Sequence, residues 1–223
     1  VLVTGHIELR GVSNVILRNF AVQGEPCATF DECRAGEDAI QIVEGTHHVC
    51  LDHLDIYDGQ DGNCDATTGS DFITVSWSQF RYTSSTKEHA FSNLIAGSDG
   101  ETESRGKLRM TYMYSWWGKG VRERMPRGRF GKVHVFNNYY STDRSDGYLI
   151  GPGVEIQMLV ENNLMEVSSE LEAFTDSFED ETTAYRATGN EGSARGMNRE
   201  KGSVFTVPYS YDLVPASEVK NLV

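Results

Sequence analysis

Three aspartates precede or begin β-rich segments and could together hold a metal ion. Asp38 lies 11 residues before Val49 and Asp61 lies 11 residues before Phe72, so the two occupy similar places in successive repeats; Asp65 follows on the same segment. Carboxylates this close repel one another unless a cation lies among them, and hard oxygen ligands suit Ca²⁺. Spacing alone is compatible both with a calcium site and with a set of solvated turn aspartates.

A cluster of basic residues interrupts this acidic chain. It comprises Arg122, Arg124, Arg127 and Arg129, with Lys119 and Lys132 on either side. Arg124 lies nine residues before the β-rich segment that begins at Val133, which predicts that it lies on the same side of the fold as the aspartates. Guanidinium groups bind carboxylates in bidentate fashion. A cation beside these arginines predicts a groove for an extended polyanion; the alternative is a solvated loop that offsets the local negative charge.

The elements that must position these side chains are short β-rich runs. Six of them begin at residues 15, 49, 72, 108, 133 and 158, and their first and third positions are apolar or threonine, as on one face of a strand. The spacings are 34, 23, 36, 25 and 25 residues, so the two long ones fit one repeat plus an insertion. This period indicates an all-β parallel solenoid rather than a β-sandwich, whose turns would recur every 8 to 12 residues or so.

The fifth position of these runs is asparagine in three of them, at Asn19, Asn137 and Asn162. Equivalent residues in successive coils stack about 4.8 Å apart, so we expect a hydrogen-bonded asparagine ladder at this position.

We interpret residues 1–223 as a single domain, with regular coils over 1–165 and irregular loops with a C-terminal packing segment over 166–223. Residues 166–185 are acidic and predict a long loop or a short helix, and residues 189–202 predict an irregular stretch. Residues 204–211 predict a strand-like segment, and residues 216–223 predict a short helix that packs back.

The composition excludes several classes of protein. A chain of 223 residues with 39% hydrophobic and 10% aromatic residues is not disordered, and it contains no apolar run of the roughly 18–20 residues that a membrane helix needs. A net charge of −13 disfavours nucleic acid as a partner. We expect a monomer that binds neither nucleic acid nor membrane. The first five residues resemble a strand entering a turn and not a signal peptide, as in a mature or trimmed chain.

Four cysteines, Cys27, Cys33, Cys50 and Cys64, lack the paired spacing of a zinc site. We expect a local disulfide between Cys27 and Cys33, and Cys50 and Cys64 could form a second. The alternative is a set of buried thiols in a cytosolic protein. Disulfides favour a secreted protein.

Several motifs resemble those of the pectate lyases of polysaccharide lyase family 1. The segment from Arg124 to Arg129 is similar to the family signature R-x-P-x-x-R. The segment from Val49 to His53 resembles V-W-I-D-H, with Cys50 in place of the usual tryptophan. Further similarity lies in residues 61–65 (D-x-x-x-D), 69–76 (a G-S-D strand), 98–99 (an S-D turn), 204–211 and 216–219.

The resemblance implies a right-handed parallel β-helix that cleaves polygalacturonate by Ca²⁺-dependent β-elimination. The implied roles are Arg124 as the base, Arg129 as a substrate-binding arginine, and Asp38, Asp61 and Asp65 as calcium ligands. Arg127 is a further candidate for substrate binding. Asp52 and His53 would be structural, beneath the site.

The chain departs from the family pattern in one binding residue. The family usually presents a substrate-binding lysine just before the Leu-Ile segment of the S-D turn, whereas Phe91 to Ile95 contains none. Lys87 or His89 would have to substitute for it. Family members also tend to be longer at the N-terminus by several coils.

An arginine base makes a specific prediction about pH, because arginine is normally protonated in proteins. We therefore expect an alkaline rate optimum. The alternatives are a non-catalytic β-helix that binds acidic polysaccharide and a glycoside hydrolase, which would need a carboxylate pair. A lyase acting on methylated pectin is disfavoured, because such enzymes tend to lose the calcium aspartates that this sequence retains.

Overall fold

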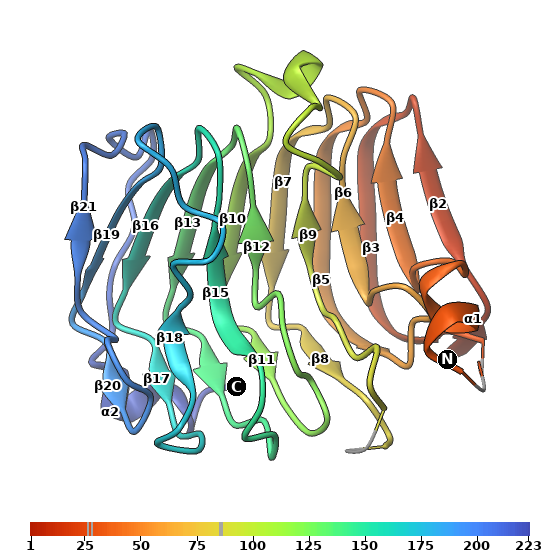
Figure 1. Cartoon of the computed structure of the whole chain (residues 1–223). Helices are drawn as coiled ribbons and strands as arrows, with labels where there is room; N and C mark the ends of the chain where they lie inside the picture. Colours follow the sequence, from red (N-terminus) through yellow and green to blue (C-terminus); the bar gives the residue numbers. More distant parts are fainter. Residues whose placement is uncertain (26, 28, 85–86) are drawn as a thin grey trace.

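The computed structural model describes residues 1–25, 27, 29–84 and 87–223, and over these residues the chain winds into a parallel β-helix (Figure 1). Strands from successive coils lie side by side along the length of the molecule. The predicted fold class, an all-β parallel solenoid, is confirmed.

Within the described residues the strands form a seven-stranded sheet and a 14-stranded sheet. The seven-stranded sheet comprises, in chain order, β2 (Ile7–Arg10), β4 (Ile40–Val43), β6 (Cys64–Ala66), β9 (Leu94–Ile95), β12 (Arg127–Gly128), β15 (Tyr148–Pro152) and β18 (Glu172–Phe174). The 14-stranded sheet consists of two stacks that share the long strands β3 (Ser13–Gln23) and β5 (His47–Tyr57).

The first stack continues from β5 through β7 (Asp71–Ser76), β10 (Arg109–Met113), β13 (Lys132–Phe136), β16 (Gln157–Glu161), β19 (Ala184–Thr188) and β21 (Glu200–Lys201). The second stack contains β1 (Leu2–Thr4), β8 (Gln79–Arg81), β11 (Trp116–Trp117), β14 (Tyr139–Tyr140), β17 (Leu164–Met165) and β20 (Glu191–Gly192). The pairing between these strands is parallel except that of β19 with β21.

The six predicted runs all fall in the first stack. Two pairs have the predicted register, Val15 with Val49 and Val133 with Met158. The runs predicted to begin at Phe72 and Leu108 differ from the predicted register, because Ile73 pairs with Val49 and Met110 pairs with Val133. Phe72, the second residue of β7, and Leu108, the residue before β10, have φ values of 51° and 56°, so the chain turns at these residues.

An asparagine ladder does form, but one residue after the predicted position. Asn138, Asn163 and Asn190 are buried and lie in successive coils. The Asn163 side chain donates to the Val135 carbonyl at 3.0 Å and accepts from the backbone N–H of Asn138 at 2.9 Å. The predicted residues Asn137 and Asn162 instead adopt positive φ and donate to the carbonyl of Val214. The ladder therefore satisfies backbone groups that the turn leaves inside the core.

Replacing Asn163 with alanine should lower the free energy of unfolding by about 3 kcal/mol, because it leaves buried backbone and amide groups without partners. Chemical denaturation followed by circular dichroism measures the change. Asn221→Ala, at an exposed asparagine, is the matched control and should have little effect. Equal stability of the two variants would contradict a structural role for the ladder.

The two long spacings are insertions between coils. The first holds α1 (Phe30–Arg34) and the Cys27–Cys33 disulfide, as predicted, and the second holds the 3₁₀ helix η1 (Thr102–Ser104). The second predicted pairing is wrong, since Cys50 and Cys64 are free. Cys50 lies on β5 of the 14-stranded sheet and Cys64 lies on β6 of the other sheet, so the two thiols belong to different faces of the coil.

The regular coils continue past residue 165, where the sequence pattern predicts their end. β18, β19 and β20 add a further coil, and the predicted acidic loop of residues 166–185 contains β18 and the start of β19. Tyr185 and Ala187 fill the inward positions of β19. Because one of these side chains is so small, the run lacks the apolar signature of the earlier strands.

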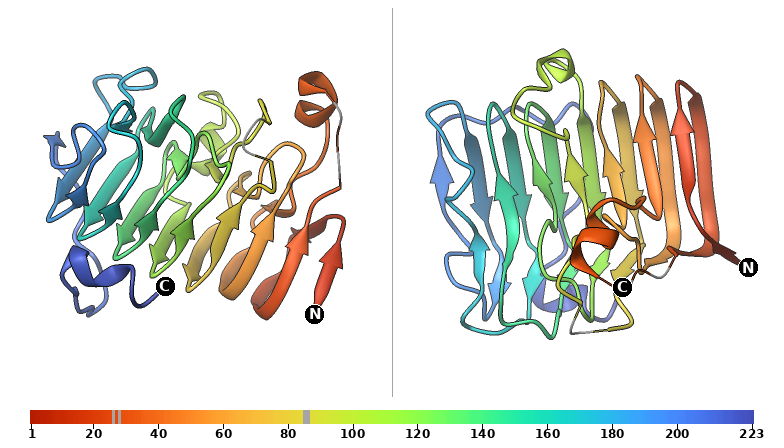
Figure 2. Two further views of the ribbon diagram at one scale, coloured as in Figure 1. Left: turned by 90° about the horizontal axis from the view of Figure 1, so that it is seen from below. Right: turned by 45° about the vertical axis from the view of Figure 1, so that its right-hand side comes forward.

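The C-terminal segment, residues 204–214, has no strand structure, contrary to the strand-like character predicted for residues 204–211. It lies against the first stack, where the Tyr209 hydroxyl is 2.7 Å from that of Thr111 and the Tyr211 hydroxyl donates to Glu161 at 2.8 Å. The short helix α2 (Ala216–Val219) follows and packs against β17 through Val219, at the blue end of the molecule (Figure 2). Among the described residues, no helix combines the length and the apolar character needed to cross a membrane.

Candidate active site

The three predicted aspartates meet at the start of the seven-stranded sheet, where β4 and β6 lie side by side (Figure 1). Asp38 precedes β4, Asp61 lies in the turn before β6, and Asp65 lies within β6. Each offers a carboxylate oxygen, and these oxygens lie within 4.8 Å of one another. The pairing of Ile40 with Cys64 produces this arrangement, because it sets the two chain segments at the same height.

The surroundings of this cluster disfavour its negative charge. Asp38 and Asp65 are 4% and 3% exposed. Burial, followed by the charges of Asp65 and Asp61, raises the pKa of Asp38 well above its ordinary value. Burial is also the main cause that raises the pKa of Asp65, to about 7. Three neighbouring carboxylates can therefore all ionise near neutral pH only if a cation compensates them.

The residues present fit a calcium ion. The Asp38 Oδ1 atom is buried and has no hydrogen-bond partner in the described part of the chain, whereas Asp65 Oδ1 accepts from the backbone N–H of Leu94 at 2.9 Å. Gly62 leaves the space between these carboxylates open, since a Cβ atom there would lie 2.8 Å from Asp38 Oδ1 and 2.9 Å from Asp65 Oδ1. Hard carboxylate ligands around an open space are typical of a Ca²⁺ site.

Arg124 faces this cluster from two coils beyond Asp61. Isolated parallel β-bridges pair Phe91 with Gly62 on one side and with Glu123 on the other, so Phe91 lies in the coil between Asp61 and Arg124. The Arg124 guanidinium lies 4.3 Å from the centre of the Phe91 ring, and its positive charge lowers the pKa of Asp38 and of Asp65 against the larger effect of burial. Its Nε atom is buried and has no hydrogen-bond partner among the residues that the structure describes. Arg124 is thus held by stacking on the Phe91 ring, and its Nε–H donor remains available for a ligand.

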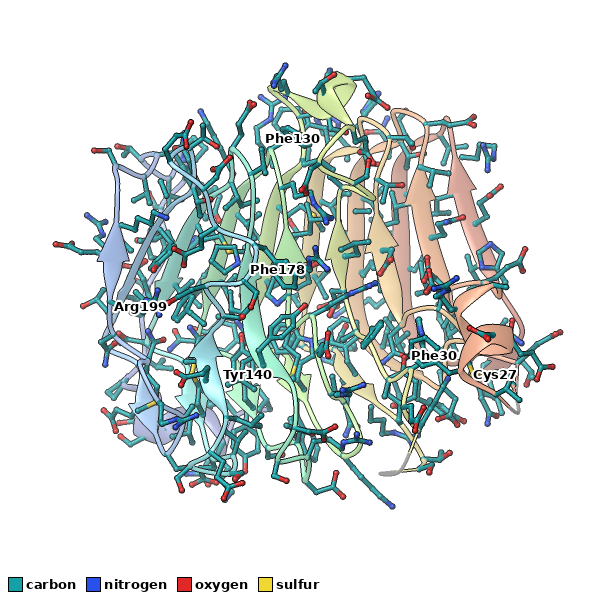
Figure 3. All side chains as sticks on the ribbon, in the orientation of Figure 1. Cys27, Phe30, Phe130, Tyr140, Phe178 and Arg199 are labelled. Carbon is teal, nitrogen blue, oxygen red and sulfur yellow. A yellow bond between two sulfur atoms is a disulfide. The ribbon has the colours of Figure 1, made fainter. Side chains whose placement is uncertain are left out.

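The two arginines that follow have different surroundings. The Arg127 guanidinium lies 3.5 Å from the ring centre of Phe178. Figure 3 shows Phe178 near the centre of the view, in the region of β12 and β15. Burial, and then the charges of Arg129 and Arg124, lower the pKa of Arg127. Arg129 is 7% exposed; its guanidinium pairs with Asp99 and donates to the Ala96 carbonyl at 2.9 Å. Arg127 is therefore the better placed of the two to meet a ligand directly.

Lys87 and His89 line a cavity of about 650 Å³ beside α1. The Lys87 ammonium donates to the Gly59 carbonyl at 2.8 Å, and burial lowers the pKa of Lys87 to about 8. His89 is 2% exposed and bonds Asp61 at 2.8 Å. A histidine this deeply buried does not fit the predicted contact with a substrate, whereas Lys87 remains partly exposed.

A model of the protein family described as pectate lyase matches residues 2–223 of the chain. The chain belongs to the pectate lyase family. Pectate lyase A of Emericella nidulans is 33% identical over 225 residues, which cover 97% of this chain and 62% of the relative. Pectate lyase E of Dickeya dadantii is 32% identical over 194 residues, or 74% of this chain and 46% of the relative. The chain thus spans less than two thirds of the length of these pectate lyases.

Solved structures of a pectate lyase and of a pollen allergen share the fold. The pectate lyase of Bacillus sp. N165, solved in complex with trigalacturonate, superposes with a TM-score of 0.79 at 24% identity, covering 98% of this chain and 68% of that one. The cedar pollen allergen jun a 1 superposes with a TM-score of 0.78, also at 24% identity and with the same coverage of 98% and 68%. At these identities the likeness concerns the parallel β-helix.

Asp52 and His53, predicted to lie beneath the site, lie on another sheet. They belong to β5 of the 14-stranded sheet, where Asp52 pairs with Arg18 and accepts from the Ser76 hydroxyl at 2.7 Å. Motif similarity alone places Asp52 and His53 near the three aspartates. The strand pairing shows instead that they belong to the other sheet.

Sequence reasoning missed the aromatic partners of the arginines, Phe91 and Phe178, and the space that Gly62 leaves between the carboxylates. Gly62, between Asp61 and Asn63, carried a signal that could have been used. A glycine flanked by candidate ligands often permits close approach of a bound group. The aromatic contacts carried none, because Phe178 lies 51 residues from Arg127 in the sequence.

Proposed function

We propose that the protein is a pectate lyase that cleaves α-1,4-linked polygalacturonate by calcium-dependent β-elimination and releases 4,5-unsaturated oligogalacturonides. One observation carries the proposal: the three carboxylates that meet within 4.8 Å are faced by an arginine whose charge acts on two of them. Family membership supports the same activity.

Asp38, Asp61 and Asp65 would hold the calcium ion. When bound there, Ca²⁺ would offset the charge of a substrate carboxylate and so make the adjacent C5–H bond more acidic. Asp38 lies just before β4, Asp65 lies within β6, and both are buried, so these carboxylates are in place before a ligand arrives. This arrangement favours the unmethylated polymer, whose free carboxylates can approach a cation.

Arg124 would accept the C5 proton. Its neutral guanidine takes the proton as the C4–C5 bond becomes a double bond and the C4–O4 bond breaks. Water protonates the leaving oxygen, so the sugar leaves as an alcohol, and the hydroxide formed takes the proton back from the guanidinium. Stacking on Phe91 holds the guanidinium in one orientation, which removes most of the entropy cost of positioning a base.

The remaining basic residues would bind the polymer. Arg127, partly exposed over Phe178, would pair with a neighbouring carboxylate in bidentate fashion. Lys87 would contact the polysaccharide on the side of the aspartates away from Arg127. Arg129 would act through its charge, because its donors already bind Asp99 and Ala96.

The test is an assay with polygalacturonate, in which the unsaturated product absorbs in the ultraviolet. We expect absorbance to grow with Ca²⁺ present, to stop on addition of chelator, and to grow fastest at alkaline pH. Methylated pectin should react more slowly. Binding without absorbance would indicate a polysaccharide-binding protein, and reducing ends without absorbance would indicate a hydrolase; either result would refute the proposal.

We also propose that the protein is secreted and acts as a monomer. The Cys27–Cys33 disulfide supports secretion, because such bonds persist in oxidising compartments.

A further inference from the structure

His89 is a buried histidine whose role is not explained by contact with a substrate. Its Nε2 atom lies 2.8 Å from Asp61 Oδ1, and because an ionised carboxylate only accepts hydrogen bonds, Nε2–H is the donor. The ring otherwise meets aromatic groups: Phe30 lies edge-on with ring centres 5.0 Å apart, and Phe91 lies at 4.3 Å. The Nδ1 atom is buried and has no partner among the described residues. The hydrogen bond to Asp61 is thus the polar contact around which this ring is packed.

Asp61 is the aspartate that most needs such support. Asp38 and Asp65 are almost fully buried beside or within a strand, whereas the Asp61 side chain is 34% exposed and lies in a turn. A partly exposed carboxylate on a turn samples several rotamers. Only one of these rotamers points the Asp61 carboxylate toward Asp38 and Asp65, and the others move it away from them. Hydrogen bonds from neighbouring side chains commonly fix the orientation of metal-binding groups.

The packing around His89 also reaches Arg124. Phe91 touches the His89 ring at 4.3 Å and stacks under the Arg124 guanidinium at 4.3 Å. On the other side, Phe30 belongs to α1, whose loop is closed by the Cys27–Cys33 disulfide; Figure 3 shows Phe30 and Cys27 together at this end of the molecule. A contiguous row of rings therefore runs from the disulfide loop to the guanidinium, with His89 in the middle.

We propose that His89 is a positioning residue: its Nε2–H bond orients the Asp61 carboxylate toward Asp38 and Asp65, so that the three form one calcium site. This inference rests on the proposed function of the same site. It assigns His89 to the support of a ligand and not to the binding of a sugar.

Two substitutions separate the hydrogen bond from the packing. His89→Phe keeps an aromatic ring between Phe30 and Phe91 but loses the donor, whereas His89→Gln keeps a donor near the Nε2 position and loses the ring. Ca²⁺ affinity is measured by titration calorimetry on the full chain at neutral pH. We expect His89→Phe to weaken binding about tenfold, and His89→Gln to bind close to wild type. In the lyase assay, His89→Phe should need more Ca²⁺ for half-maximal rate while its rate at saturating Ca²⁺ stays near wild type.

His134→Phe is the matched control, since His134 is also buried and also bonds a carboxylate, that of Glu161 at 3.1 Å, on the other sheet. Its Ca²⁺ affinity should equal that of wild type. Wild-type affinity in His89→Phe, or an equal loss in His134→Phe, would overturn the inference. The variants could show the expected Ca²⁺ affinities while the wild-type protein has no lyase activity. That result would refute the proposed function but not the role of His89. A wild-type protein that binds no Ca²⁺ would overturn both.

Discussion

Arg124→Lys should reduce the rate of β-elimination by about 10²- to 10⁴-fold, the usual contribution of a general base, and should leave Ca²⁺ binding unchanged. Lysine keeps the positive charge beside Asp38 and Asp65, so the ligand set remains compensated to the same degree. It loses the planar group that stacks on Phe91, and its single nitrogen cannot occupy the positions of the guanidinium nitrogens.

The measurements are the initial rate of absorbance increase at saturating Ca²⁺ and a calorimetric Ca²⁺ titration of the same variant. Arg122→Lys is the matched control, because Arg122 lies in the same loop but pairs with Asp146. It should retain a rate close to wild type. An Arg124→Lys enzyme with the wild-type rate would show that another group removes the proton.

Asp65→Asn should abolish calcium-dependent activity and yet stabilise the metal-free protein. The pKa of Asp65 is raised by burial to about 7 from an ordinary value of 3.8, so the folded state holds a proton that the unfolded state releases. Stability of the metal-free wild type therefore falls as pH rises from about 4 to about 7, by roughly 4 kcal/mol at most for this group. Asparagine removes the charge, and its carbonyl oxygen can still accept from the Leu94 N–H.

Thermal unfolding in chelator and in Ca²⁺, over a range of pH, measures both effects. Above pH 7 the variant should unfold at a higher temperature than wild type in chelator, and Ca²⁺ should raise the unfolding temperature of the wild type only. Asp71→Asn is a control of opposite sign. Burial opposes the charge of Asp71, but hydrogen bonds from Arg109 more than offset this and lower its pKa, so its removal should destabilise the fold at neutral pH. A metal-free Asp65→Asn protein less stable than wild type would contradict the repulsion argument.

The fold could be predicted from the sequence because its coils repeat the same pattern of inward apolar residues. Register was predictable where that pattern was clean, as between Val133 and Met158, and it slipped where Phe72 and Leu108 turned a corner with apolar side chains. The last coil was missed because Ala187 fills an inward position with a small side chain. The apolar pattern of a sequence therefore predicts strands with apolar inward residues well, but it does not locate the corners between them.

The aspartates of the candidate site could be brought together from spacing alone, since residues at equal places in adjacent coils become neighbours. The contacts around them could not. His89, Phe91 and Phe178 act through long-range packing that leaves no local trace in the sequence. The pairing of Cys50 with Cys64 was a poor prediction for the same reason, because spacing does not reveal which face of a coil a thiol occupies.

The C-terminal segment has a consequence for how the molecule comes apart. A solenoid whose coils touch only their neighbours resembles a one-dimensional chain of units, and it can lose them one at a time from an end. Here Tyr209 bonds to β10 and β13, Tyr211 bonds to β16, and Val214 accepts from residues in the turns after β13 and β16. These bonds link the three successive coils of β10, β13 and β16 through one segment, so these three coils cannot fray singly. This part of the β-helix should unfold as one cooperative block, and a segment that lies far along the chain completes it.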